Sequence, residues 1–295
     1  MVTLKKKNIN GNTYYYLEHS YRKNGKVSKK EKYLGTTLPK NIDTIKEKFL
    51  REFYQETWFN RFDTIKEQFI KEKKKMPLSI EKKENEQFAI TFTYNTNRIE
   101  GSTITLRETA ELLEHGISPS QRPLEDIKET EAHKEVFYDM LNYKKEMTLP
   151  TVLYWHKQLF QYTKPDAAGQ IRDYTVGISG SRFKPPYPIE LDFLLREFFD
   201  WYHKNKNTLH PVFLAGLVQL KFVTIHPFGD GNGRISRLLM NYVLNKNGCP
   251  MLIIPYSQRM SYYTALERSQ LKKDENVFIL WFFKRYLKEY KKYLK

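Results

Sequence analysis

The organisation of this chain is decided by one stretch, His226-Pro227-Phe228-Gly229-Asp230-Gly231-Asn232-Gly233-Arg234-Ile235-Ser236-Arg237. A nearly all-apolar run over residues 211–225 precedes it and predicts a buried helix that stops at Pro227. A short loop with three glycines follows, and a second helix is expected to begin near Asn232 or Gly233. The predicted fold is therefore built around two helices and the loop that joins them.

The start of the second helix is suited to an anion. Its first turn leaves backbone N–H groups unpaired, and the helix dipole places partial positive charge there. Gly231 and Gly233 allow a ligand to approach the backbone closely, and phosphate is the natural occupant. Arg234 and Arg237 lie three residues apart, so both project to the same side of the helix and can clamp a phosphate.

Two further side chains of this stretch carry chemistry. Asp230 offers a hard oxygen ligand beside the phosphate site, which suits Mg²⁺. His226 has an ordinary pKa near neutrality and can act as a general base. Taken singly, a histidine at a helix end or a glycine-rich turn is more often structural than catalytic. Their occurrence together with two arginines in a single short segment indicates an active site.

The chain is long enough for one large domain and an appendage. Its 295 residues are 40% hydrophobic and 28% charged, as in a soluble globular protein. The run Lys5-Lys6-Lys7 follows the first residues directly, so no secretory leader is expected. No membrane span is expected either, because no uninterrupted apolar stretch is long enough to cross a bilayer. Cys249 is the single cysteine, which excludes an intrachain disulfide and fits a cytoplasmic protein. The net charge of +16 favours anionic partners, including nucleic acid, unless the lysines only provide solubility.

Residues 1–38 differ in texture from the rest of the chain. Residues 13–21 are rich in strand formers, Asn24-Gly25 is a hairpin turn signal, and residues 26–34 are expected to form the returning strand. This segment is therefore predicted to be a small β-hairpin module. Its tyrosines and lysines could contact a nucleic acid, or its aromatic face could pack on the helical body or on a third strand.

From about residue 40 the apolar spacing becomes helical. Helices are expected over 41–75 (as one helix or two), 80–100, 105–116, 124–145, 149–162, 189–204, 211–226, 232–246, 258–272 and 276–292. Residues 163–187 interrupt this pattern, because residues 174–179 alternate like a short strand and Gly180-Ser181 could turn. An excursion of this kind in a helical body often covers a functional site.

The stretch from His226 to Arg237 resembles the signature of the Fic (Fic/Doc) family, H-x-F-x-D/E-G-N-G-R-x-x-R, and matches it at every fixed position. Residues 169–172, the strand after them and residues 183–186 look like the flap of that family. The resemblance covers about residues 85–285. It implies a mainly α fold, a Fic-type helical bundle core with a β-hairpin flap, to which the N-terminal hairpin module is added. The predicted parts are 1–38, 39–84 and 85–295, the last with a flap at about 169–187.

The resemblance also implies a reaction, the transfer of AMP from Mg·ATP to a Ser, Thr or Tyr hydroxyl of a target protein. His226 would deprotonate the hydroxyl, and Asp230 would hold Mg²⁺ between the α- and β-phosphates. Gly233 favours AMP transfer over phosphorylation, which is linked to relatives with Lys there. The implied ATP and phosphate ligands are Phe228, Gly231, Asn232, Gly233, Arg234 and Arg237. The flap would hold the target as an added strand through Tyr174, Thr175, Val176, Gly177 and Ile178.

A second motif suggests control. The segment from Thr96 to Gly101 resembles the inhibitory pattern of the family, S/T-x-x-x-E-G/N, on a helix expected at about 80–101. In relatives with this pattern the Glu, here Glu100, pairs with the second signature arginine, here Arg237, and denies it to the γ-phosphate. The alternative is an ordinary surface Glu near a helix C-terminus, a place where the dipole disfavours a carboxylate.

The adenine site departs from the family pattern. Some relatives carry Asn-x-Gly-Asp after paired tyrosines, with the Asn in the adenine pocket, whereas residues 269–274 here read Ser-Gln-Leu-Lys-Lys-Asp. Gln270 could substitute for that Asn. The candidates for the pocket are Asn241, Tyr262, Tyr263 and Gln270, and the two tyrosines could equally belong to the helix core.

The sequence therefore predicts a protein adenylyltransferase that is inhibited by its own Glu100. Three alternatives stay open: a hydrolase that removes AMP, with Glu100 orienting a water; a basic nucleic-acid-binding regulator with a subsidiary Fic core; and transfer of another group, such as another nucleotide or phosphocholine. The expected ligands are ATP, Mg²⁺ and a target protein. A homodimer and nucleic-acid binding are left open, and no membrane contact is expected.

Overall fold

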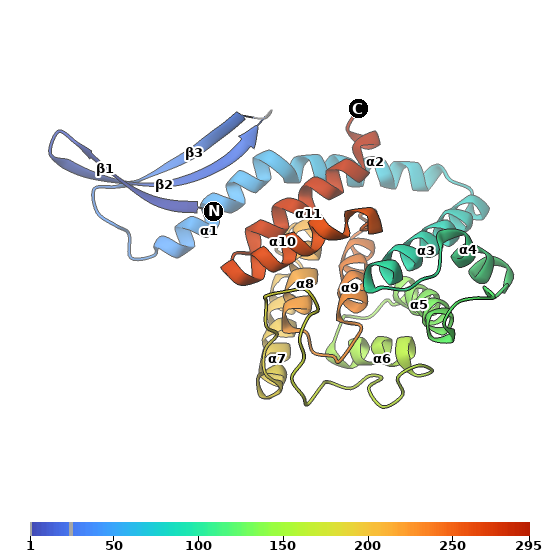
Figure 1. Ribbon diagram of the computed structural model, residues 1–295. Helices are drawn as coiled ribbons and strands as arrows, with labels where there is room; N and C mark the ends of the chain where they lie inside the picture. Colours follow the sequence, from blue (N-terminus) through green and yellow to red (C-terminus); the bar gives the residue numbers. More distant parts are fainter. Residues whose placement is uncertain (1, 24–25) are drawn as a thin grey trace. The chain divides into compact units, whose positions relative to one another are not determined.

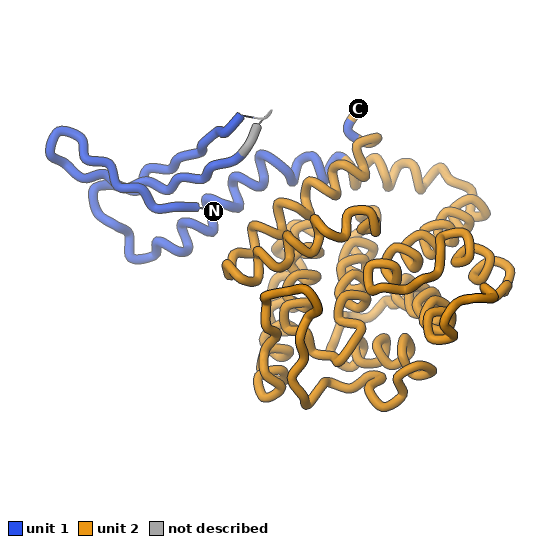
Figure 2. Tube along the Cα trace, viewed as in Figure 1, with its two compact units in different colours: residues 1–64, 294 blue, residues 65–293, 295 orange. Residues whose placement is uncertain are grey.

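The structure is a computed structural model that describes residues 2–23 and 26–295 (Figure 1). Contacts divide the chain into two compact units, residues 1–64 with Leu294 and residues 65–293 with Lys295 (Figure 2). Each unit is described by itself. The predicted turn at Asn24-Gly25 lies outside the described residues, and the predicted division at residues 38 and 84 stays a prediction.

The first unit contains a three-stranded antiparallel sheet of order β1-β2-β3, formed by Val2–Ile9, Asn12–Lys23 and Lys26–Gly35. The prediction of a β2–β3 hairpin omitted β1 as an element. The reason is that consecutive lysines are poor strand formers. In the sheet they lie opposite tyrosines, as in the pair Lys5–Tyr16, and the Lys7 ammonium lies 4.4 Å from the centre of the Tyr16 ring. Cross-strand pairing thus compensates for low intrinsic propensity.

One helix of this unit packs on the sheet. Helix α1 (Ile42–Tyr54) places Phe53 with its ring centre 4.5 Å from that of His19 and 4.8 Å from that of Tyr21. Because side chains alternate along a strand, these two β2 residues share one face of the sheet. A π-helical turn at Gln55–Phe59 separates α1 from α2 (Asn60–Lys75), which gives the helical break that was left open over residues 41–75.

The second unit is a helical bundle. Its α-helices after α2 are α3 (Leu78–Glu100), α4 (Leu106–His115), α5 (Leu124–Asn142), α6 (Leu149–Phe160), α7 (Pro188–Asn205), α8 (Pro211–Ile225), α9 (Asn232–Lys246), α10 (Arg259–Lys272) and α11 (Glu275–Glu289). Helix α8 is buried nearly all round and contacts α7, α9 and α11, as its apolar sequence predicts. In the described part of the chain, no helix is long and apolar enough to cross a membrane.

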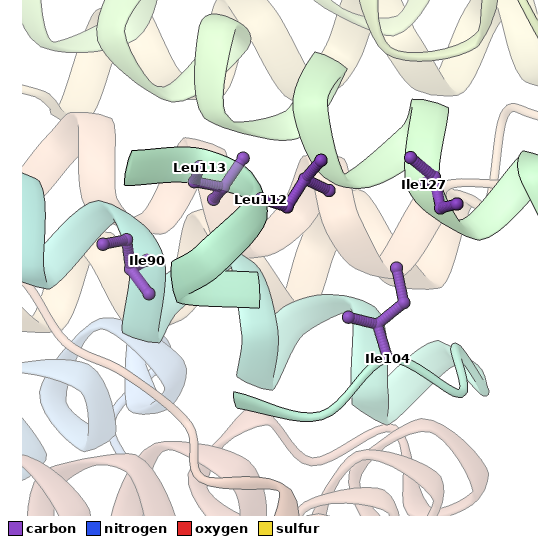
Figure 3. Close-up of a cluster of buried hydrophobic side chains, with 5 residues drawn as sticks. All are labelled: Ile90, Ile104, Leu112, Leu113 and Ile127. Atoms are coloured by element: carbon purple, nitrogen blue, oxygen red, sulfur yellow. The ribbon is translucent and has the colours of Figure 1, made fainter. Parts of the chain in front are cut away.

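The helix that carries Glu100 is anchored by its neighbours. Helix α3 packs against α4 and α5 through a small apolar cluster, to which Ile90, Leu112 and Ile127 each contribute from a different helix (Figure 3). The sequence sets both ends of this region. Gly101 ends α3 in the left-handed conformation, and Thr105 forms the predicted capping box of α4. The position of the α3 C-terminus is thereby fixed.

The segment between α6 and α7 contains no strand within the described residues, so the strand predicted at residues 174–179 is wrong. A lone extended segment has no ladder partner, and here side chains of the described residues bind it only near its two ends. Arg172 Nη1 donates to the Tyr174 carbonyl at 2.8 Å. The Glu267 carboxylate accepts hydrogen bonds from the Ser181 hydroxyl at 3.1 Å and the Arg182 N–H at 2.6 Å. We call residues 169–187 the flap segment.

Candidate active site

His226 ends helix α8. Its backbone is left-handed, with φ at +52°, so the chain leaves the helix there and enters the glycine-rich loop. Its Nδ1 lies 3.2 Å from the Val223 carbonyl oxygen. A carbonyl only accepts hydrogen bonds, so this contact places the proton on Nδ1 and leaves the lone pair of Nε2 free. The ring is therefore held in the tautomer that can take a proton.

The electrostatic surroundings keep His226 neutral. Burial of the ring lowers its pKa below the ordinary value, and the nearby Arg172 guanidinium acts in the same direction. The Val223 carbonyl and the carboxylates of Glu100 and Asp230 oppose this shift without cancelling it. A neutral imidazole near pH 7 is the form that a general base requires.

The loop after His226 is rigid because its own side chains close it. The Asn232 amide accepts a hydrogen bond from the Phe228 N–H at 2.9 Å and donates to the Phe228 carbonyl at 2.8 Å. The Phe228 ring is fully buried and stacks on His156 with ring centres 3.7 Å apart. Asn232 and Phe228, both predicted as phosphate ligands, thus hold the loop that leads into the first turn of α9.

Helix α9 begins at Asn232 and presents its first turn to the predicted phosphate site. Glu100 occupies the space above that turn. A Cβ built on Gly233 would lie only 2.2 Å from Glu100 Oε1, so only glycine fits beneath the carboxylate. An anionic side chain of the protein itself therefore sits at the positive end of α9, where a phosphate would bind.

The same carboxylate pairs with Arg237. Glu100 Oε1 lies 2.5 Å from Arg237 Nη2, and Arg237 also donates to Thr96, to its carbonyl at 3.2 Å and to its hydroxyl at 3.4 Å. Arg237 is 1% exposed. Burial opposes its charge, but the Glu100 carboxylate together with Tyr262 and Tyr263 raises the pKa of Arg237. The structure thus brings together Thr96, Glu100 and Arg237, as predicted for an inhibitory contact.

Arg234 is held by acidic partners. It forms an ion pair with the buried Glu129, and its Nη2 lies 3.2 Å from Asp230 Oδ2. Burial opposes the charge of Arg234, while Glu129 and Asp230 raise its pKa. Lys164 joins the cluster, with its ammonium 3.0 Å from Glu129 Oε1 and 2.8 Å from Asp230 Oδ2.

Asp230 is suited to the metal role predicted for it. Burial would raise its pKa, but the Arg234 and Lys164 cations and the Gly231 N–H, which donates to Oδ1 at 2.5 Å, lower the pKa to about 2. The carboxylate is therefore ionised near neutrality and remains partly exposed beside the N-terminus of α9. Mg²⁺ is commonly held by one or two carboxylates together with substrate phosphates, so this single carboxylate fits the ion.

The cavity at this site is small. A polar cavity of about 240 Å³ is lined by Glu100, Glu129, Lys164, Asp230 and Arg234, among others. Sites for small molecules usually measure about 300–1,000 Å³. The described conformation is therefore tight around the phosphate position, as expected when Glu100 fills part of it.

Comparisons with known proteins relate the segment that carries this site to a known family. The family model described as Fic/DOC family matches residues 146–244. The matched residues include the whole stretch from His226 to Arg237. It is similar to a protein named protein adenylyltransferase Fic from Drosophila grimshawi, with 38% identity over 184 residues, which cover 59% of this chain and 36% of that protein. The protein of the same name from Drosophila melanogaster is 37% identical over 184 residues, which again cover 59% of this chain and 36% of that protein. The chain thus spans about a third of the length of these relatives.

Solved structures share the fold. A Fic-domain-containing signalling protein from Bacteroides thetaiotaomicron superposes with a TM-score of 0.71 at 23% identity, over 80% of this chain and 95% of that one. Fic-1 from C. elegans superposes with a TM-score of 0.70 at 25% identity, over 87% of this chain and 77% of that one. The Fic-type helical core expected from the sequence is therefore present.

The predicted adenine residues are not gathered in one open pocket of the Fic core. Asn241 has no exposed surface, and its amide bonds both the N–H and the carbonyl of Leu252, so it orders the chain after α9. Tyr262 is 1% exposed. Tyr263 is partly exposed, but its hydroxyl donates to the Ile99 carbonyl at 2.8 Å. Gln270 donates to the Thr224 hydroxyl at 3.1 Å, beside a separate cavity of about 520 Å³.

The flap residues of the Fic core lie where a target could reach them. Tyr174, Thr175 and Gly177 are exposed, and Val176 and Ile178 are half-buried. The Tyr174 hydroxyl lies against the signature loop, because a Cβ built on Gly229 would meet it at 2.1 Å. The flap segment thus adjoins the loop that begins at His226.

Two residues that position this Fic site were missed from the sequence. Arg172 is 4% exposed and donates to the carbonyls of His226 at 2.9 Å and Pro186 at 2.7 Å, which ties the catalytic loop to both ends of the flap. His156 accepts the Gly169 N–H at Nδ1 (2.9 Å), so its Nε2 donates to the Asp230 carbonyl at 3.0 Å. Their contacts with His226 and Asp230 span 54 and 74 positions of the sequence, so no local pattern reveals them.

Proposed function

We propose that the chain is a protein adenylyltransferase, which transfers AMP from ATP to a hydroxyl group of a target protein. The observation that carries the proposal is the juxtaposition of a neutral His226 with a free Nε2, the first turn of α9 and a carboxylate that occupies the place of a phosphate on that turn. The identity of 37–38% with proteins named protein adenylyltransferase Fic supports the same activity.

The residues divide the reaction between them. Nε2 of His226 takes the proton of the target hydroxyl as its oxygen attacks the α-phosphorus of ATP. The bond between the α-phosphorus and the bridging oxygen breaks, and pyrophosphate leaves. The N–H groups at the start of α9 and the guanidinium groups of Arg234 and Arg237 stabilise the negative charge that develops on the phosphate oxygens. The target then carries AMP on its hydroxyl oxygen.

Asp230 would hold Mg²⁺ beside the phosphate site, where the ion would supply positive charge to neutralise the phosphates. The support on this side is the ionised, partly exposed carboxylate at the N-terminus of α9. Residues 174–178 of the flap segment would hold the target chain in an extended conformation beside His226. Their backbone carries no strand pairing, so an added strand would be their first ladder partner.

We also propose that Glu100 inhibits the enzyme. In the described conformation its carboxylate pairs with Arg237 and covers the first turn of α9. ATP placed there would meet a like charge and would lack one of its cationic ligands. Displacement of Glu100 is therefore required before the phosphates can take their reactive position.

The class of reaction can be tested with radiolabelled ATP and the Glu100→Gly variant. ATP labelled on the α-phosphate should label protein, whereas ATP labelled on the γ-phosphate should not. Label from the γ-position alone would show phosphorylation and would overturn the proposal. Release of AMP from a modified target, without any incorporation, would instead establish the hydrolase alternative.

A further inference from the structure

Lys164 lies beside Asp230 and has no role in the proposed reaction. It follows α6, its backbone N–H donates to the Phe160 carbonyl at 2.8 Å, and its ammonium lies 5.1 Å from the centre of the Phe160 ring. The ammonium contacts three carboxylates, Glu125 at 2.7 Å, Asp230 at 2.8 Å and Glu129 at 3.0 Å. A cation of the protein itself therefore lies at the carboxylate that would hold Mg²⁺.

Every oxygen of Asp230 is engaged. Oδ1 accepts the Gly231 N–H, and Oδ2 is shared by Lys164 and Arg234. Mg²⁺ requires ligand oxygens at about 2.0–2.1 Å, a distance that brings it into repulsive contact with an ammonium on the same oxygen. One of the two side chains must leave Oδ2 before the metal binds.

Lys164 is the side chain that can leave. It is 31% exposed, and after release from Asp230 it keeps Glu125 and Glu129 as partners. Arg234 is 5% exposed and is held by Glu129 in the interior. The movement of one flexible ammonium therefore opens the metal position without leaving a buried charge unpaired.

We propose that Lys164 is an internal counter-cation, which occupies the divalent-cation position at Asp230 and keeps the metal affinity of the free enzyme low. The cation then enters effectively only together with the nucleotide, whose phosphates supply further ligands. This inference rests on the proposed role of Asp230 as the metal ligand, and it assigns to Lys164 a positioning role and not a chemical step.

The test measures metal binding without nucleotide and without turnover. Mn²⁺, a hard divalent ion with a paramagnetic signal, is titrated into the full chain and the free ion is followed by electron paramagnetic resonance. Lys164→Met should bind Mn²⁺ at least about tenfold more tightly than wild type, because three carboxylates lose a competing cation. Lys164→Arg, which keeps the charge, should behave like wild type. The matched control is Lys128→Met on α5, because Lys128 makes no ion pair within residues 2–23 and 26–295.

Two results would overturn the inference. A folded Lys164→Met protein that binds Mn²⁺ no better than wild type would show that Lys164 does not compete with the metal. A tighter affinity that survives in Lys164→Met/Asp230→Asn would place the ion on Glu125 and Glu129 instead of Asp230. Because AMP transfer is not measured, a chain that gains Mn²⁺ affinity but transfers no AMP would retain this inference and lose the proposed activity.

Discussion

Replacement of Glu100 by Gln tests the inhibitory contact through two opposite effects, on stability and on ATP affinity. Gln keeps the shape of the side chain but removes the charge that pairs with Arg237, which is 1% exposed. Loss of one partner of a fully buried ion pair costs about 3–5 kcal/mol, and the loss is smaller here because the Glu100 side chain is 26% exposed. Gln can still accept one hydrogen bond, and Thr96 still accepts two from Arg237. We therefore expect the free energy of unfolding to fall by about 2–3 kcal/mol.

The affinity for ATP should change in the other direction. Without Glu100 the Arg237 guanidinium can pair with a phosphate, and a hydrogen bond to a charged group contributes about 1.5–3 kcal/mol. This corresponds to a decrease in the Kd for ATP of about 10- to 150-fold. ATP at 100 times its Kd would then restore about 2.7 kcal/mol of stability to the variant.

Urea unfolding with and without Mg·ATP, together with isothermal titration calorimetry of ATP binding, measures both effects. Glu111→Gln is the matched control. Its carboxylate pairs with Arg107 at 2.9 Å on an exposed face of α4, where an ion pair contributes about 0.3–0.5 kcal/mol. The reasoning is refuted if Glu100→Gln is as stable as wild type and binds ATP with the wild-type Kd.

Three further predictions concern the surroundings of the site. Burial lowers the pKa of His156 to about 4 and that of His133 to about 3, so the unfolded chain binds their protons at higher pH. The contribution of these two neutral histidines to the free energy of unfolding should be complete above about pH 6.5. Between pH 6 and 4 the free energy of unfolding should fall by up to about 2.7 kcal/mol per pH unit. Equal urea midpoints at pH 7 and 5 would contradict this expectation. Arg172→Lys should lower kcat at least about tenfold with a smaller change in the Kd for ATP, because the catalytic loop loses its tie to the flap; a change confined to the Kd would refute this positioning role. Tyr263→Phe removes the hydrogen bond to the Ile99 carbonyl and should raise basal AMP transfer a few-fold, and unchanged transfer would show that this contact does not hold Glu100 in place.

Much of the fold could be predicted from the sequence because the signals are local. The nearly all-apolar residues 211–225, the glycine at position 101 and the capping box at Thr105 fix helix ends within a few residues. Strand β1 is not predicted from the sequence, because its lysines are poor strand formers that are stabilised only by tyrosines on the neighbouring strand. The strand predicted in the flap segment is wrong for the opposite reason, because alternating apolar and polar residues do not form a strand without a pairing partner.

The site residues likewise fall into those that could be predicted from local sequence and those that could not. Residues 226–237 lie in one segment, so their chemistry could be inferred from spacing, and the inhibitory motif could be linked to Arg237 only through resemblance to a family. Glu129 and Lys164 reach Asp230 and Arg234 from segments 65 or more positions earlier in the chain. Side chains that meet only through packing give no sequence pattern, and the buried network around the signature was therefore missed.

The central claim is that His226 catalyses AMP transfer and that Glu100 restrains it. The most direct test incubates wild type, Glu100→Gly, His226→Ala and the double variant with Mg²⁺ and ATP labelled on the α-phosphate, and measures label on protein. We expect strong labelling of Glu100→Gly, weak labelling of wild type and none of either protein that lacks His226. A Glu100→Gly protein that binds ATP but incorporates no label, or equal labelling with and without His226, would contradict the claim.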